Sequence, residues 1–277
     1  SLGNLGEILR DTGDYTAARP LFERALKIRE SALGLNHPDY AAGLTSLGHL
    51  LYLMGDMAAA RPLLEQALQI RERALGPDHP TVATTVNDLG SVLWRSGEYA
   101  RARAHFERAL RIREKALGPT HTSVAQSLTN LGVLLRDAGD YAAARPLLER
   151  GLKIYEQAVG PDHHWTAWAA HHLAYLLHRP GDLAGSRQLY ERALRIREKT
   201  LGPDNPSVAA SLQSLAFLLR ATGDRTGAQA MYERALQIRE KTLGPPHPSV
   251  GWTLMSVAYL HRGAGDSAAA RPLFERA

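Results

Sequence analysis

The sequence predicts an all-α fold, a right-handed superhelical solenoid built from antiparallel helix pairs. The main observation is a turn, Gly-Asp in six copies and Gly-Glu in one, that returns every 42 residues without insertion. The glycines of these turns are Gly13, Gly55, Gly97, Gly139, Gly181, Gly223 and Gly265. A strict period of this length is typical of stacked supersecondary units, each of which contacts only its neighbours.

A second observation is the set of small and bulky residues at fixed distances around each turn. In the third copy these are Gly90 before the turn and Ala102, Phe106 and Ala109 after it. Small residues allow two helix backbones to approach closely, and a bulky residue fills the space beside them. We therefore expect one helix on each side of every turn, with the two packed against each other.

The repeat divides the 277 residues into a single array with a partial unit at each end. Because both ends match the inside of a repeat, we expect the chain to be a segment of a longer protein. Apolar faces left uncovered at these ends predict fraying or end-to-end self-association of chains. The expected units are 1–37 (partial), 38–79, 80–121, 122–163, 164–205, 206–247 and 248–277 (partial).

Each unit is predicted to contain two helices, and the third unit shows the signals clearly. Its first helix begins at Pro80, because the missing N–H of proline needs no partner at the first helical position. Gly97 ends this helix, since glycine readily adopts the left-handed backbone conformation of a helix end. The second helix is expected over 99–117, and Gly118 and Pro119 end it.

Composition excludes several classes of protein. The chain has no cysteine, which excludes disulfides and thiolate chemistry. No apolar run approaches the roughly 20 residues that span a bilayer, so no membrane partner is expected. Nothing in the sequence demands an oxidising compartment, and we expect a cytoplasmic location.

Motifs for catalysis are missing, and we expect a non-enzyme without catalytic residues, cofactor or metal. No phosphate-binding glycine loop, His-Glu-x-x-His or Gly-x-Ser-x-Gly motif occurs. Five histidines share the loop position before a first helix, and Asn205 takes that place in another unit. These histidines are His37, His79, His121, His163 and His247. Because asparagine is a favoured N-cap, we interpret the column as helix caps rather than metal ligands.

The formal net charge of +5 raises the question of nucleic-acid binding. Many basic residues follow a glutamate by four positions, as Lys27 follows Glu23, and such pairs are typical of a solvated outer helix face. Helical-repeat proteins that read RNA need a polar code at fixed columns, and the corresponding column here is mixed. The pattern therefore argues against nucleic acid as a partner.

The pattern of Leu-Gly on the first helix and Ala-x₃-Phe…Ala on the second resembles the tetratricopeptide repeat. The 42-residue unit and the linking phrase Arg-Glu-Arg-Ala-Leu-Gly-Pro-Asp-His-Pro at 71–80 look like the kinesin light chain type, and a composition rich in Arg, Ala and Gly suits a bacterial source. The resemblance implies that the first helices line a concave wall that binds a peptide. In kinesin light chains, asparagines of these helices hold the backbone of the cargo peptide, and Asn87 and Asn130 match that motif.

A second set of candidate binding residues lies on the expected inner face of repeats five to seven, where aromatic residues replace small or polar ones. Exposed aromatic side chains dominate binding energy at interfaces, and arginines one turn further on can meet an acidic group of the ligand. The alternative is that these rings pack against the next repeat. The candidates are Trp168, His171, Tyr175, Phe217, Arg220, Trp252, Tyr259 and Arg262.

Together these features predict a scaffold module that binds a protein or peptide segment in the groove of the first helices. One alternative is a regulatory or sensor arm of a larger signalling or nucleotide-switch protein, which would act by intramolecular packing. A purely structural spacer is the other alternative. The neighbouring domains of the parent protein would separate them, because a nucleotide-binding domain favours the regulatory arm and a coiled coil favours an adaptor.

Overall fold

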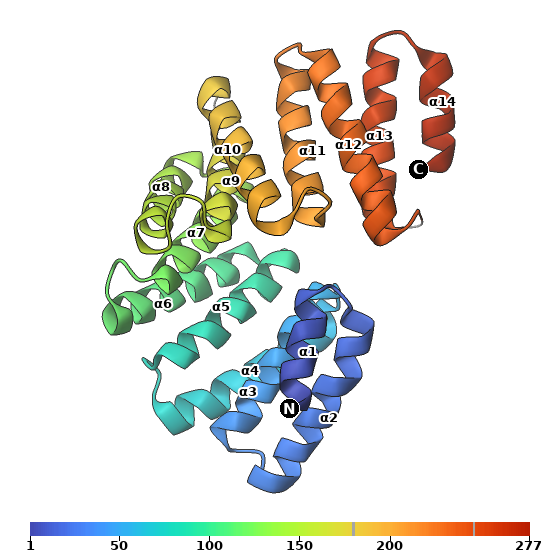
Figure 1. Ribbon diagram of the computed structural model, residues 1–277. Helices are drawn as coiled ribbons and strands as arrows, with labels where there is room; N and C mark the ends of the chain where they lie inside the picture. The colour runs from blue at the N-terminus through green and yellow to red at the C-terminus, as the bar shows by residue number, and fades with distance from the viewer. Residues whose placement is uncertain (179–180, 246) are drawn as a thin grey trace. The chain divides into compact units, whose positions relative to one another are not determined.

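A computed structural model of the chain describes residues 1–178, 181–245 and 247–277. The described residues form fourteen α-helices, shown in Figure 1, and no strand. The helices are α1 (Leu2–Asp11), α2 (Tyr15–Leu33), α3 (Pro38–Leu53), α4 (Met57–Leu75), α5 (Pro80–Arg95), α6 (Tyr99–Leu117), α7 (Thr122–Asp137), α8 (Tyr141–Ala158), α9 (His164–His178), α10 (Leu183–Leu201), α11 (Pro206–Ala221), α12 (Arg225–Leu243), α13 (Pro248–Gly263) and α14 (Ser267–Arg276). The predicted all-α array of helix pairs is confirmed.

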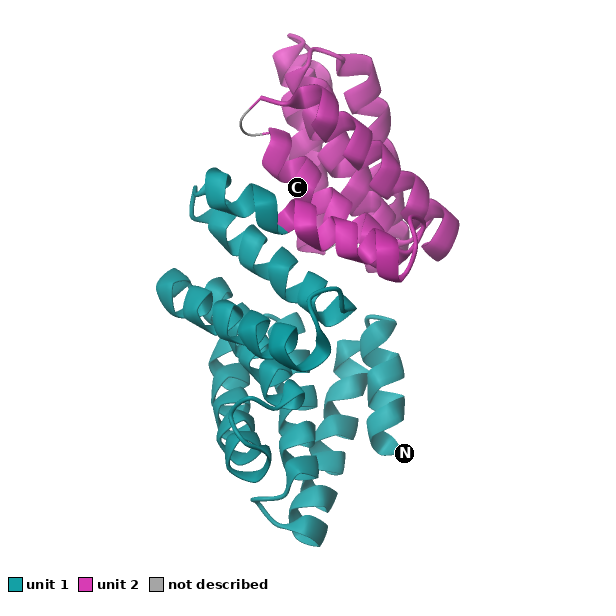
Figure 2. Ribbon diagram, turned by 90° about the vertical axis from the view of Figure 1, so that its left-hand side faces the viewer, with its two compact units in different colours: residues 1–147 teal, residues 148–277 magenta. Residues whose placement is uncertain are grey.

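Two compact units make up the chain, residues 1–147 and residues 148–277, and the boundary between them falls inside α8 (Figure 2). In each unit, a short turn joins the two helices of a pair, which run antiparallel along each other, as α5 and α6 do in the first unit (Figure 1). From the second repeat on, the first helices begin at residues 38, 80, 122, 164, 206 and 248, where the repeat pattern places the starts of the units. Among the described helices, none combines the length and apolar character needed to cross a membrane.

Helix starts follow two capping patterns. Before a second helix, an aspartate carboxylate accepts a hydrogen bond from the backbone N–H of the residue three positions later. Asp56 Oδ1, for example, accepts from the Ala59 N–H at 3.0 Å. Before a first helix, the predicted histidine column fills this role: His121 Nδ1 accepts from Ser123 N–H at 3.1 Å, and Asn205 Oδ1 accepts from Ser207 N–H at 2.8 Å. The capping interpretation of this column is confirmed, since these groups satisfy backbone donors that a helix start leaves without a partner.

Helix ends depend on glycine. Gly97 and Gly118 have backbone φ angles of 81° and 84°, in the left-handed region that other residues avoid. The Gly97 N–H donates to the Trp94 carbonyl at 3.0 Å, and the Gly118 N–H donates to the Glu114 carbonyl at 3.1 Å. The chain thereby turns after each helix while the last carbonyls keep their hydrogen bonds.

The core of a helix pair depends on a close approach between a small residue and a ring. A Cβ added at Gly90 would lie 2.9 Å from two atoms of the Phe106 ring, and both Phe106 and Ala102 are fully buried. The equivalent contact in the second repeat joins Gly48 to Leu64, also at 2.9 Å. The small residues before each turn are therefore required for packing within the pair.

Four arginines near the ends of second helices are buried and tie each pair to the next. In each case Nη1 donates to a carbonyl ten residues on and to a hydroxyl fourteen residues on. Arg197 donates to the Ser207 carbonyl at 3.3 Å and to Ser211 Oγ at 2.6 Å. Burial lowers the pKa of Arg197 to about 10. We call these contacts arginine staples, and they start at Arg71, Arg113, Arg197 and Arg239.

Candidate functional site

Three of the predicted binding residues form an exposed aromatic face on α11 and α13, which we define as Phe217, Trp252 and Tyr259. Their side chains are 42%, 65% and 44% exposed. Trp252 and Tyr259 lie seven residues apart on α13 and therefore share one side of the helix. Large rings that stay this exposed do not serve the core of the fold, so the aromatic face is available to a partner.

Each of two predicted arginines lies three residues after a ring of the aromatic face. The guanidinium carbon of Arg220 is 5.3 Å from the centre of the Phe217 ring, and that of Arg262 is 4.8 Å from the centre of the Tyr259 ring. Both arginines are exposed. The structure thus places positive charge directly against aromatic surface, and cation–π attraction holds it there.

A pocket of about 240 Å³ opens beside Phe217 and has two tyrosines in its walls that are nearly buried. We call it the tyrosine pocket; its lining residues are Tyr175, Tyr190, Gln213, Ser214, Phe217, Tyr232 and Ser256. Burial raises the pKa of Tyr232, although nearby Arg220 lowers it. The phenol therefore stays protonated near neutral pH and can donate a hydrogen bond. The pocket combines aromatic walls with several polar groups, the composition of a ligand-binding cavity.

Sequence reasoning found only part of this pocket. Tyr175 and Phe217 were among the predicted candidates, whereas Tyr190 and Tyr232 occupy a column that was assigned to the core of the helix pair. The sequence does distinguish these two residues, because tyrosine occurs in this column of the repeat only at positions 190 and 232. The other members of the column are Phe22, Leu64, Phe106, Leu148 and Phe274. A phenol among otherwise apolar residues indicates a cavity edge, because a buried hydroxyl needs a polar partner.

Three further predicted residues on α9 lie deeper. Trp168, His171 and Tyr175 are all half-buried. The Trp168 ring stands edge-on to the ring of Tyr155 at 6.4 Å, and the His171 ring stands edge-on to that of Tyr190 at 5.3 Å. Tyr175 packs against the core of the helix pairs that follow it. These side chains support the fold as well as any binding surface.

In the contact between α8 and α9, aromatic residues replace the arginine staple that other repeats form at the equivalent positions. Tyr155 takes the arginine position, and Ala169, fourteen residues on, takes the position of the hydroxyl. The Tyr155 ring stacks on that of Trp165 with a centroid distance of 6.2 Å and an interplanar angle of 13°. Apolar ring contacts therefore replace a charged hydrogen-bonded contact in this repeat. The sequence alone shows that the arginine and the hydroxyl are both replaced in this repeat, by Tyr155 and Ala169.

The two predicted asparagines lie in the first unit and contact each other. Asn130 Nδ2 donates to Asn87 Oδ1 at 2.9 Å, and only 4% of Asn87 is exposed. The Asn87 side chain also lowers the pKa of the neighbouring Asp88, against the effect of burial. The role of these asparagines in peptide binding remains a prediction.

Asp88 belongs to a polar pocket of about 380 Å³ in the first unit that sequence reasoning did not find. We call it the Asp88 pocket; its lining residues are Arg10, Ala42, Thr45, Ser46, His49, Arg71, Thr81, Thr84 and Asp88. Burial raises the pKa of Asp88, and the opposing influence of His49, Arg113 and Arg71 does not cancel this effect. A carboxylate in such surroundings is a candidate for ligand binding.

The raised pKa of Asp88 predicts a pH-dependent stability. Because the folded-state pKa lies above the ordinary 3.8, the contribution of this group to the free energy of unfolding is greatest below pH 3.8 and falls as the pH rises through the folded-state pKa. The Asp88→Asn variant cannot ionise there and keeps a similar shape. We expect its melting temperature to exceed that of the wild type by a margin that grows as the pH rises above 3.8. A margin that does not change with pH would contradict the assignment.

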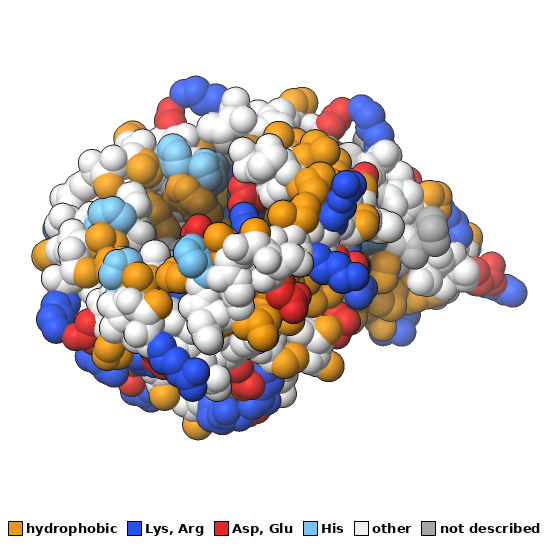
Figure 3. Space-filling model, turned by 90° about the horizontal axis from the view of Figure 1, so that it is seen from below, with side chains coloured by type: hydrophobic (Ala, Val, Ile, Leu, Met, Phe, Trp, Pro, Cys, Tyr) orange, Lys and Arg blue, Asp and Glu red, His pale blue; other side chains and the backbone are white. Residues whose placement is uncertain are grey.

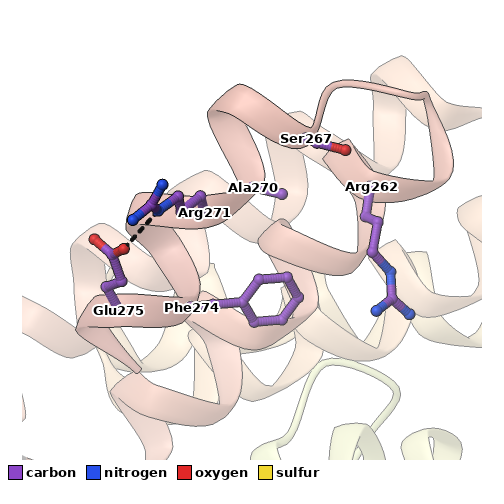
Figure 4. Close-up of a pocket in the computed structure, with 6 residues that line it drawn as sticks. All are labelled: Arg262, Ser267, Ala270, Arg271, Phe274 and Glu275. Carbon is purple, nitrogen blue, oxygen red and sulfur yellow. Dashed lines mark hydrogen bonds and ion pairs between the residues drawn. The ribbon is translucent and has the colours of Figure 1, made fainter.

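A third hollow lies on the last helix pair, next to Arg262. It has a volume of about 380 Å³ and is lined by Arg262, Ser267, Ala270, Arg271, Phe274 and Glu275. In Figure 4 the Phe274 ring points toward the side of α13 from which Arg262 extends, while the Arg271–Glu275 ion pair, at 2.8 Å, lies on the far side of α14. The Phe274 ring also meets the ring of Tyr259 edge-on at 5.2 Å. The hollow therefore extends the aromatic face onto α14.

Charges are paired along the outer helices. Arg108 binds Glu72 and Arg192 binds Glu156, both at 2.5 Å, and Lys199 binds Asp162 at 2.6 Å. Each of these contacts joins the second helices of adjacent repeats or the loop that follows them. On the face drawn in Figure 3, Lys and Arg side chains lie among Asp and Glu side chains and hydrophobic patches.

Comparisons with known proteins agree with this architecture. The model of the tetratricopeptide repeat family matches segments that together cover the chain, at residues 1–72, 41–115, 81–157, 123–199, 165–241 and 207–277. No curated protein matches the sequence.

Solved structures with a similar fold include BtubC (BKLC) from P. vanneervenii, with 22% identity and a TM-score of 0.64 over 85% of this chain and 92% of that one. A Podosopora anserina protein with nearly identical repeats of the kinesin light chain type has 27% identity and a TM-score of 0.61 over 75% and 98%. The Rap conjugation gene regulator of plasmid pLS20, solved with the Phr* peptide, has 15% identity and a TM-score of 0.73 over 98% and 70%. For BtubC and the Rap regulator the likeness is one of fold alone.

Proposed function

Since the chain belongs to the tetratricopeptide repeat family, we propose that it binds a peptide or protein segment along its first helices, with the aromatic face as the main anchor. The resemblance to this family, and to repeats of the kinesin light chain type, is confirmed by the matches. A Rap regulator of similar fold is solved with a peptide, which supports a peptide as the ligand class here as well. The single observation that carries the proposal is the exposure of Phe217, Trp252 and Tyr259.

The proposal rests on the energetics of exposed rings. Burying an aromatic side chain removes a large apolar area from water, and such residues act as hot spots at interfaces. The tyrosine pocket beside Phe217 has a volume of about 240 Å³, which suits one large apolar side chain of the partner. Arg220 and Arg262 stand next to the rings and can pair with a carboxylate of the same partner. We therefore expect the preferred segment to carry an apolar anchor with an acidic residue nearby.

This function can be tested with peptides selected from a random library on the wild-type chain. Affinities of the selected peptides are then measured by fluorescence polarisation for the wild type and for the triple variant Phe217→Ala, Trp252→Ala, Tyr259→Ala. We expect the triple variant to bind at least about 100-fold more weakly, because each hot-spot ring contributes on the order of 2 kcal/mol. Its melting temperature should change little, since all three rings are exposed.

The matched control is Tyr99→Ala, which removes a ring that is 45% exposed at the start of a second helix. This variant should bind the selected peptides like the wild type. Binding of the selected peptides by the triple variant with the affinity of the wild type would contradict the proposal. Unfolding of the triple variant would also contradict it, because the rings would then belong to the core.

A further inference from the structure

The Asp88 pocket lies in the first unit, away from the residues of the aromatic face in the sequence, and the proposed function makes no use of it. Its lining side chains are almost all polar or charged, with hydroxyls from Thr45, Ser46, Thr81 and Thr84. Its volume of about 380 Å³ lies in the range of small-molecule sites. A cavity of this size with convergent polar groups is suited to a small polar ligand rather than to a large apolar side chain.

The charges that line the pocket have both signs. Asp88 is the only carboxylate among the described lining residues, whereas Arg10 and Arg71 each contribute a guanidinium. The Arg10 guanidinium also pairs with Asp11, which does not line the pocket, at 2.9 Å. Arg71 is held by hydrogen bonds from its Nη1 to the Thr81 carbonyl and the Thr85 hydroxyl. Its guanidinium group is therefore held in place before a ligand arrives. Such preorganisation reduces the entropy that binding costs.

Other repeats have no carboxylate at the position of Asp88. The same column of the repeat holds asparagine at Asn4 and Asn130 and serine at Ser46, Ser214 and Ser256. Asparagine would fill the same space without a buried charge, and a buried charge destabilises the folded state unless it is well paired. The repeat therefore does not require the carboxyl group of Asp88, which lies among the charged groups His49, Arg71 and Arg113.

We propose that the Asp88 pocket binds a small zwitterion of the α-amino acid class, a free amino acid or a dipeptide. The ammonium group of the ligand pairs with the carboxylate of Asp88, and its carboxylate pairs with Arg10 and Arg71. A simple anion of this size would meet the charge of Asp88, and a simple cation would meet the two guanidinium groups. A zwitterion satisfies both, and the hydroxyls can bind its polar side chain.

The test uses the full chain and the twenty free L-amino acids, screened by saturation-transfer NMR and then measured by isothermal titration calorimetry. We expect at least one amino acid to bind with a Kd below about 1 mM. Its N-acetyl derivative, which lacks the ammonium group, and its carboxamide, which lacks the carboxylate, should each bind at least about tenfold more weakly. No binding up to about 10 mM would overturn the proposal, and so would a derivative that binds as well as its parent.

Variants assign the binding to this pocket. Asp88→Asn should weaken binding at least about tenfold while leaving the chain folded, and it should remove the penalty for N-acetylation. Arg10 is half-buried and also pairs with Asp11. Arg10→Gln should weaken the binding of the free amino acid and leave that of the carboxamide unchanged. The aromatic triple variant serves as the control and should bind the amino acid like the wild type. If the chain binds amino acids but no peptide, only the proposed peptide-binding function fails. If it binds peptides but no amino acid, only the proposal for the Asp88 pocket fails.

Discussion

Replacing Ser211 by alanine is expected to lower the free energy of unfolding by about 3 kcal/mol. Ser211 Oγ accepts from Nη1 of Arg197 at 2.6 Å, and both residues are buried. Alanine removes the acceptor without adding bulk to this fully buried site, so a guanidinium N–H is left in a buried place without its partner. The change is measured by denaturant unfolding, followed by circular dichroism.

A double-mutant cycle separates this contact from a general effect of substitution. The pair Arg197→Tyr with Ser211→Ala reproduces the combination that the chain itself carries at Tyr155 and Ala169. We expect the double variant to be less destabilised than the sum of the two single changes. Ser214→Ala is the control, because this half-buried hydroxyl donates only to a carbonyl of its own helix, Ala210, at 3.1 Å. Additive single changes would show that the arginine staple does not act as a unit.

Replacing Gly90 by leucine should destabilise the first unit by about 3 kcal/mol through overpacking. A Cβ at this position would already lie 2.9 Å from the Phe106 ring, which is fully buried and has no space to move into. The added side chain must therefore push α5 and α6 apart. Hydrogen exchange should show faster exchange in the amides of these two helices than in the wild type.

The matched control is Gly263→Leu at the end of α13. No atom lies within 4 Å of a Cβ added there, so the same chemical change meets no neighbour. We expect its free energy of unfolding to stay within about 0.5 kcal/mol of the wild type. A Gly90→Leu variant that unfolds like this control would show that the two helices are not in the close contact described.

Periodicity and local chemistry determined the helices. The return of the same turn every 42 residues, with glycine at the left-handed position and a capping residue beside it, is encoded within a few neighbouring residues. The histidine and asparagine caps were correctly interpreted for the same reason, since the capped N–H lies two residues away. Interactions at such short range depend little on the rest of the fold.

Sequence reasoning predicted the aromatic face but not its surroundings. Phe217, Trp252 and Tyr259 stood out because they replace small or polar residues at equivalent positions of other repeats, which is a comparison within the sequence. The exposure of each ring was not predictable in this way, and Trp168 and Tyr175 from the same columns lie deeper. Neighbouring helices decide which rings remain accessible.

Only the tertiary structure revealed the arginine staples and the Asp88 pocket. Arg197 and Ser211 are fourteen residues apart and belong to different repeats, and the Asp88 pocket gathers Arg10, Arg71 and Asp88 from separate helices. Each residue read alone fits an ordinary polar position of a helix. The pKa of Asp88 rises because several helices together exclude water from its carboxylate. The sequence by itself determined the helices, their caps and their pairing, because these depend on neighbours along the chain. Which polar groups meet, and which lose water, depends on how the pairs pack, and that was decided by the tertiary structure.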